Sequence, residues 1–139
     1  MVFATYSAER FEMKRKILTL LLVFTVAMAY ADIFGDISNA IRSGDARSVA
    51  RFFNSTVDLT IQNQEEVYSK PQAEQVLRDF FSKNSPRSFT LIHKGVSKEG
   101  AKYAIGTLVT SQGVEYRTYF FVKQTTSGEL IQELRFEKQ

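Results

Sequence analysis

Residues 101–123, AKYAIGTLVTSQGVEYRTYFFVK, decide the fold of this chain. Two runs rich in the β-branched and aromatic residues that favour strands flank the tripeptide Ser111-Gln112-Gly113. A short polar segment with a glycine between two such runs is typical of a hairpin turn. The stretch therefore predicts a long antiparallel hairpin that the rest of the chain covers or extends.

The turn determines which residues of the two strands lie opposite each other. With Thr110 paired to Val114, one face carries two cross-strand pairs: Tyr103 with Phe121, and Ile105 with Tyr119. The other face carries Ala104, Gly106, Leu108, Tyr116, Thr118 and Phe120. Both faces are largely apolar, so we expect a helix to cover one face and the other to be a pocket wall or a dimer surface. Gly106 in mid-strand predicts a bulge or a sharp bend.

The composition excludes several classes of function. The chain has 139 residues, a length typical of one domain, and no cysteine, which rules out disulfides, thiolate metal sites and a lipid anchor on an N-terminal cysteine. Its net charge is +3, but residues 1–31 hold four basic and two acidic residues. The remaining chain has 14 basic and 13 acidic residues, so no basic field indicates nucleic acid or an anionic membrane as a partner.

The N-terminal segment has the organisation of a secretory signal peptide. The basic cluster Met13–Lys16 precedes an apolar run, residues 17–28, and Ala29-Tyr30-Ala31 supplies the small-x-small pattern of a cleavage site. The apolar run is too short to span a bilayer core, which needs roughly 20 residues.

We therefore expect residues 1–31 to be a signal peptide with an upstream extension, the true start at Met13, and cleavage between Ala31 and Asp32. The mature chain is then a single domain over residues 32–139. The expected localisation is secreted or periplasmic, with no stable membrane span after cleavage.

Helical periodicity marks three segments of the mature chain. Asp32 caps a first helix that ends at Gly44, and Asp45 caps a shorter helix that runs to Phe53. Ser69 starts the third helix with a capping-box pattern, Ser followed three residues later by Gln. Its apolar face consists of Ala73, Val76, Leu77, Phe80 and Phe81.

The other segments have strand character. Strands are predicted over residues 56–62, 67–68, 88–97, 101–110, 114–123 and 129–137. Helices followed by a run of antiparallel strands indicate an α+β fold.

This order of elements resembles the nuclear transport factor 2-like superfamily, also called SnoaL-like or cystatin-like. More narrowly, the chain is similar to a family of small secreted bacterial proteins classed only as a domain of unknown function. The matching stretches are DIFGDISNAIRSGDARSVARFF, YSKPQAEQVLRDFF and the strand segments FTLIHKG, YAIGTLVT, YRTYFFVK and LIQELRFEK. The resemblance implies a cone-like, cystatin-like roll in which N-terminal helices pack in the concave face of a strongly curved antiparallel sheet. It implies no activity, because the family has no established one.

Enzymes of this superfamily place carboxylates, a tyrosine or a histidine inside the cone. His93 is the only histidine and lies within a strand, so we expect a surface or hydrogen-bonded residue rather than a general acid or base. Asp58 shares the polar side of the first strand with Thr56 and Thr60, which favours a solvated face over a catalytic carboxylate.

Charged residues also alternate along two of the later strands. Glu115 and Arg117 share one face of the hairpin, and Glu133 and Arg135 share one face of the last strand. If these strands are neighbours, we expect a solvent-facing charge ladder rather than an Asp/Arg-type catalytic set, which would need a dry cavity.

No glycine-rich phosphate loop, G-x-S-x-G or HExxH motif is present. We expect a secreted, non-catalytic module without cofactor or metal that binds a small apolar ligand or a protein partner, a homodimer through the sheet included. The candidate pocket or interface residues are Tyr103, Tyr116, Arg117, Tyr119 and Phe121. The alternative is a small hydrolase or isomerase acting in the cone pocket, which would need a buried carboxylate beside a Tyr, His or Arg.

Overall fold

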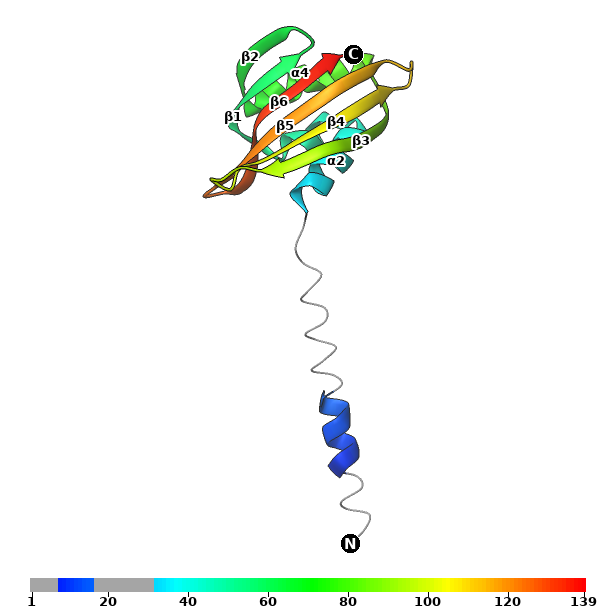
Figure 1. Cartoon of the computed structure of the whole chain (residues 1–139), viewed down its shortest axis with the longest axis vertical. Helices are drawn as coiled ribbons and strands as arrows, with labels where there is room; N and C mark the ends of the chain where they lie inside the picture. Colours follow the sequence, from blue (N-terminus) through cyan, green and yellow to red (C-terminus); the bar gives the residue numbers. More distant parts are fainter. Residues whose placement is uncertain (1–7, 17–31) are drawn as a thin grey trace. The chain divides into compact units, whose positions relative to one another are not determined.

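The computed structural model describes residues 8–16 and 32–139, which belong to two units, Met1–Ala31 and Asp32–Gln139 (Figure 1). In the first unit, residues 8–16 form a helix in which Arg15 pairs with Glu12 at 3.0 Å. The predicted apolar run and the Ala31 side of the predicted cleavage site lie outside the described residues. Neither described range contains a helix that is long and apolar enough to cross a membrane.

The second unit begins with two capped helices. In α2 (Ile33–Ser43), Oδ1 of Asp32 accepts a hydrogen bond from the Phe34 N–H at 3.1 Å. The helix ends at Gly44, whose φ of 68° is the left-handed conformation that glycine adopts without strain. Asp45 caps α3 (Ala46–Ala50) in the same way, by accepting from a backbone N–H. The sequence therefore predicts where both helices start.

The predicted extension of α3 to Phe53 is wrong, because the helix ends at Ala50 and β1 (Phe53–Ile61) starts three residues later. The Phe52 carbonyl accepts a hydrogen bond from the Ile131 N–H at 2.6 Å, so the chain has already joined the sheet at this point. Pairing with a distant strand overrides the local helical pattern here.

The third helix is α4 (Lys70–Lys83), with the predicted capping box between Ser69 and Gln72. Before it, β2 (Gln64–Ser69) is longer than the short returning strand that the sequence predicts. The turn between β1 and β2 is also tighter than predicted, and Gln62 adopts a φ of 57° within it.

The last four strands complete a six-stranded sheet with the order β2-β1-β6-β5-β4-β3. They are β3 (Pro86–Val96), β4 (Lys102–Thr110), β5 (Glu115–Thr125) and β6 (Gly128–Lys138). All neighbouring strands are antiparallel except β1 and β6, which pair in parallel and so depart from the purely antiparallel sheet that the sequence predicts. Figure 1 shows this sheet curled around the helices, which confirms the α+β class and the expected arrangement.

The predicted register of the β4–β5 hairpin is confirmed, with Tyr103 opposite Phe121 and Ile105 opposite Tyr119. A bulge also lies beside Gly106, where the pairing of β3 with β4 shifts between Leu91 and His93. A Cβ atom on Gly106 would lie 2.6 Å from Cζ of Phe89, so only glycine fits at this bend.

Aromatic and aliphatic side chains fill the space between the helices and the inner face of the sheet. Phe80 of α4 packs against Tyr116 with ring centroids 5.2 Å apart and against Phe136 at 4.9 Å. Phe34 of α2 lies 6.4 Å from Phe120 in the same way. These contacts join the helices to β5 and β6, so the hairpin forms the centre of the core.

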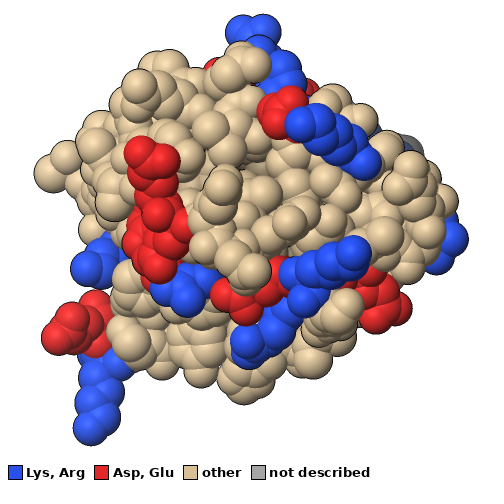
Figure 2. Space-filling view, turned by 90° about the horizontal axis from the view of Figure 1, so that it is seen from above, with Lys and Arg blue, Asp and Glu red and all other residues tan. Residues whose placement is uncertain are grey.

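Charged side chains of both signs are interspersed on the face of the molecule that Figure 2 shows. No large area of that face carries a single sign. This agrees with the nearly balanced composition of the chain after residue 31.

Candidate functional site

The helices lie on one side of the sheet, and the opposite side of β3 to β6 is not covered by any element of residues 32–139. We call this side the outer face. It carries Tyr103, Ile105, Arg117, Tyr119, Phe121, Glu133, Arg135 and Glu137. Four of the five predicted pocket or interface residues therefore lie together, and the aromatic ones among them are only half-buried.

The aromatic part of the outer face extends onto β3 through Tyr103. A Cβ atom on Gly95 would lie 2.6 Å from the Tyr103 ring, so the ring lies directly against the backbone of β3. Nε2 of His93 lies 3.3 Å from the Tyr103 hydroxyl, and the histidine is exposed. His93 is therefore the hydrogen-bonded strand residue that the sequence predicts, at the border of the aromatic area.

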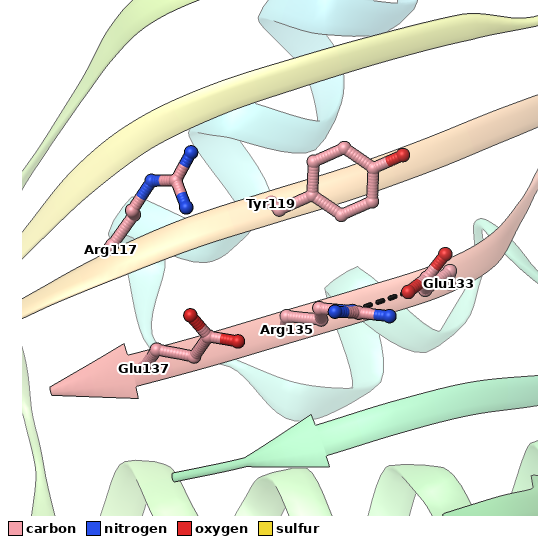
Figure 3. Close-up of a pocket in the computed structure, with 5 residues that line it drawn as sticks. All are labelled: Arg117, Tyr119, Glu133, Arg135 and Glu137. Carbon is pink, nitrogen blue, oxygen red and sulfur yellow. Dashed lines mark hydrogen bonds and ion pairs between the residues drawn. The ribbon is translucent and has the colours of Figure 1, made fainter. Parts of the chain in front are cut away.

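A row of charged residues runs beside the aromatic area on β5 and β6 (Figure 3). Arg117 lies opposite Glu137, and Tyr119 lies opposite Arg135. Nε of Arg135 donates a hydrogen bond to Glu133 on the same strand. These five residues line a shallow pocket of about 310 Å³, and its two positive and two negative groups balance.

The neighbours of the pocket shift two of its pKa values upward. Partial burial, followed by the nearby Glu133 carboxylate, raises the pKa of Tyr119 above its usual value of 10.0. The hydrogen bond to Glu133 is the largest cause of the raised pKa of Arg135. At neutral pH the pocket therefore presents a protonated tyrosine hydroxyl between charged groups.

The outer face continues onto β1, where two polar atoms are buried without a partner. Oγ1 of Thr60 and Oδ1 of Asp58 are both inaccessible and accept or donate no hydrogen bond among the described residues. Thr60 lies beside Arg135, whose guanidinium reaches on to within 3.9 Å of Glu65 on β2. The long arginine side chain thus covers this part of β1. The expectation of a solvated face is wrong for Thr60 and for Oδ1 of Asp58, whereas Thr56 on the same side is exposed.

The predicted charge ladder is present in altered form. Arg117, Glu133 and Arg135 belong to it, but Glu115 lies at its end, exposed and opposite Val109. Glu137, which was not among the four predicted members, lies opposite Arg117. The alternation along β6 places Glu137 on the same face as Glu133 and Arg135, but its position opposite Arg117 depends on the pairing of β5 with β6.

Tyr116 does not belong to the outer face. It is 3% exposed, lies on the inner face opposite Leu108, and donates a hydrogen bond to Oδ1 of Asn84 at 2.9 Å. Its hydroxyl is therefore already satisfied inside the core, and its role is structural.

The space inside the curved sheet is occupied by side chains of the core. Its largest fully buried members include Phe53, Phe89, Phe120, Phe136, Leu59, Leu77, Leu108 and Leu134. The alternative of a hydrolase or isomerase requires a cavity at this place, with a carboxylate in it. Phe and Leu side chains fill the place where such a cavity would lie, which argues against that alternative.

No group of three or more His, Cys, Asp or Glu side chains within residues 8–16 and 32–139 is arranged to hold a metal ion. On the outer face, the Glu133 carboxylate accepts a hydrogen bond from Arg135.

Solved structures similar to this chain have the same architecture. A DUF4783 family protein from Bacteroides fragilis is 31% identical with a TM-score of 0.71, over 78% of this chain and 100% of that one. A DUF4783 family protein from Bacteroides ovatus is 27% identical with a TM-score of 0.70, over 75% of this chain and 93% of that one. An NTF-2 like protein of unknown function from Silicibacter pomeroyi shares the fold alone, at 10% identity and a TM-score of 0.54, over 76% and 89% of the two chains.

Among curated proteins, nothing matches this chain. The family model of a domain of unknown function, DUF4783, matches residues 34–137, which include every helix and strand of the second unit except the first residue of α2 and the last of β6. The predicted similarity to a family classed only as a domain of unknown function is confirmed, the nuclear transport factor 2-like resemblance holds for the fold, and the chain belongs to the DUF4783 family.

Proposed function

We propose that this protein is a non-catalytic binding module that uses its outer face to bind a protein partner, and that this partner is a second copy of the same chain. The observation that carries the proposal is the aromatic area on that face. Tyr103, Ile105, Tyr119 and Phe121 are half-exposed, form two adjacent cross-strand pairs, and have no helix over them. Burying such apolar surface is favourable by about 25 cal/mol per Å².

The row of charges next to the aromatic area suits a second copy. A two-fold axis along the strands, between β5 and β6, places each of these strands over the other strand of the partner. Arg117 then faces Glu137 of the partner subunit, and Tyr119 faces Arg135 of the partner subunit. The first contact pairs opposite charges, and the second places a guanidinium over an aromatic ring.

The interior gives less support to a small apolar ligand. The core side chains pack against each other, with Phe80 and Phe136 only 4.9 Å apart between their ring centroids. A ligand inside the cone would have to displace them, whereas a partner on the outer face displaces only water. We therefore favour the protein partner over the ligand.

Sedimentation velocity over a wide concentration range tests the dimer. We expect a dimer that Tyr119→Lys converts to a monomer, because the new ammonium would face Arg135 of the partner subunit across the two-fold axis. Circular dichroism of the variant checks that its fold is intact. Ile92→Lys is the matched control, since Ile92 is 66% exposed at the bulge of β3 and outside the aromatic area. A chain that stays monomeric at all concentrations would overturn the proposal.

A charge exchange distinguishes a second copy from another protein. Arg117→Glu and Glu137→Arg should each weaken the dimer, because each places like charges face to face across the two-fold axis. The double variant restores opposite charges, so its dimer should recover. Failure of the double variant to recover would exclude this axis.

We also propose that the chain is exported and that its mature form begins at Asp32. Support comes from the basic cluster, the short apolar run and the small-x-small pattern before Asp32. N-terminal sequencing of the exported protein should give Asp32 as the first residue. Val2 or Met13 in that position would contradict cleavage.

A further inference from the structure

A second pocket, of about 460 Å³, lies at the end of the sheet where β1 begins and β5 turns into β6. Its walls come from three separate segments. Arg51 and Ser55 flank the start of β1, Lys70 is the first residue of α4, and Thr126 and Ser127 form the turn between β5 and β6. The strand pairing brings these segments together. Thr56 of β1 pairs with Ser69, the residue before α4, and Thr125 pairs with Gly128 across the turn between β5 and β6.

The pocket lies where the pairing of β1 with β6 is interrupted. Phe53 pairs with Ile131, and the next pair is Asp58 with Glu133. Between these two pairs, residues 54–57 of β1 lie opposite a single residue of β6, Gln132. The side chain of Asn54 spans this gap and donates a hydrogen bond to Gln132 at 3.1 Å. Irregular pairing of this kind frees backbone groups and is over-represented next to binding sites.

The charge of this pocket is entirely positive. Arg51 and Lys70 line it, and none of the residues that line it is acidic. Neither cation has a direct ion pair in the part of the chain that the structure describes, although Arg78, Lys83, Lys102 and Arg135 all have one. Arg51 does act on the Asp45 carboxylate, whose pKa it helps to lower. The first turn of α4 also lacks an acidic residue, and Glu74, one turn after Lys70, pairs with Arg78 at 3.3 Å.

The remaining walls combine two apolar side chains, Phe53 and Leu130, with neutral groups that can donate hydrogen bonds. Ser55, Thr126 and Ser127 contribute hydroxyls, and the three are exposed to solvent. The hydroxyl of Thr125 is held in place by the Gly128 carbonyl at 2.8 Å and accepts from the Ser127 N–H at 3.1 Å, which fixes the shape of the turn. Two cations and a ring of hydroxyls around a pocket are a donor set for an anion with several oxygen atoms.

We infer that this pocket binds a tetrahedral oxyanion, phosphate or sulfate, either free or as a group on a larger molecule. Arg51 binds two of its oxygen atoms through the planar guanidinium, and the Lys70 ammonium supplies a second positive charge. The hydroxyls of Ser55 and Thr126 donate to the remaining oxygens. The pocket lies at the end of the sheet and not on the outer face, so it remains open when the outer face is covered.

Titration of the full chain with inorganic phosphate, sulfate and a simple phosphate monoester, followed by amide NMR, tests the site. We expect saturable shifts at Thr126 and Ser127 with at least one of the three, and no such shifts with chloride at the same ionic strength. If the monoester binds more tightly than inorganic phosphate, the natural ligand is an anionic group on a larger molecule. If the free anion binds as tightly, the pocket takes the anion itself.

The double variant Arg51→Gln/Lys70→Gln should weaken this binding by about tenfold or more, because it removes two charge-assisted contacts. Arg87→Gln/Lys138→Gln is the matched control. It removes the same charge from exposed residues at the opposite end of the sheet and should leave the affinity unchanged. Equal loss in both variants, or equal shifts with chloride, would overturn the site by showing an effect of net charge only.

Discussion

The hydroxyl of Tyr116 donates a hydrogen bond to Oδ1 of Asn84 at 2.9 Å and so joins β5 to the end of α4. Nδ2 of the same asparagine donates to the Phe80 carbonyl at 3.1 Å. One side chain therefore both terminates the helix and fixes its position on the sheet. The Phe80 ring packs edge-on against Tyr116, so the polar contact and the apolar contact support the same geometry.

Tyr116→Phe should destabilise the domain by about 1–3 kcal/mol, because Oδ1 of Asn84 loses its donor in a partly buried place. Urea denaturation followed by circular dichroism measures the change. Tyr119→Phe is the control, since the structure gives that hydroxyl no hydrogen bond among the described residues, and its effect should stay within about 0.5 kcal/mol. Equal losses in both variants would show that the Asn84 contact contributes nothing of its own.

The register of the β4–β5 hairpin could be predicted from sequence, because it depends on a short turn and on a local pattern. The same holds for α2, α3 and α4, whose first residues follow capping side chains. The parallel pairing of β1 with β6 could not be predicted, since it joins Phe53 to Ile131 and no local pattern encodes it. The wrong end of α3 has the same origin, because Phe52 belongs to that pairing.

Gly106→Ala should destabilise the domain by about 1–3 kcal/mol. The new Cβ would lie 2.6 Å from Cζ of Phe89 and 2.8 Å from the Thr90 carbonyl oxygen, and the latter belongs to the backbone and cannot rotate away. Gly35→Ala in α2 is the control. Its Cβ would lie 3.6 Å from the nearest atom, so a helical alanine there should stabilise the domain by up to about 1 kcal/mol. Thermal unfolding should show a lower melting temperature for Gly106→Ala and an unchanged or higher one for Gly35→Ala.

The members of the outer face could be predicted only in part. Tyr103, Tyr119 and Phe121 follow from the hairpin alone, but the pairing of Arg117 with Glu137 requires the register of β6. The second pocket gave no signal in the sequence. Its cations, Arg51 and Lys70, are 19 positions apart and come together only because β1 and α4 start at the same end of the sheet.

Thr60→Val should stabilise the domain by about 1 kcal/mol or more, because it removes a buried hydroxyl that has no hydrogen-bond partner. Thr118→Val is the matched control, since Thr118 is fully buried and its hydroxyl donates to the Tyr116 carbonyl at 3.4 Å. That variant should be neutral or destabilising. Chemical denaturation of the pair gives the comparison, and a loss of stability in Thr60→Val would indicate that the hydroxyl has a bound partner in solution.

The stability of the domain should depend on the ionisation of Asp45 in acid. The hydrogen bond from the Ser48 hydroxyl, at 2.7 Å, is the largest cause of a pKa below the usual 3.8. The Arg47 and Ser48 backbone N–H groups and the positive charge of Arg51 lower the pKa further. Because the folded state lowers this pKa, the contribution of the carboxylate is complete above pH 3.8 and is lost as the pH falls through the lower folded-state value.

Asp45→Asn tests this linkage, because asparagine keeps the capping oxygen but cannot ionise. Above pH 3.8 the wild-type chain should be more stable than the variant, and the difference should shrink as the pH is lowered further. Ser48→Ala removes the main cause of the lowered pKa. In a chain that carries Ser48→Ala, adding Asp45→Asn should therefore reduce stability at neutral pH by less than it does in the wild-type chain. Urea midpoints measured along a pH series give both comparisons. A difference between wild type and Asp45→Asn that stays constant along the series would mean that the carboxylate acts only as a neutral cap.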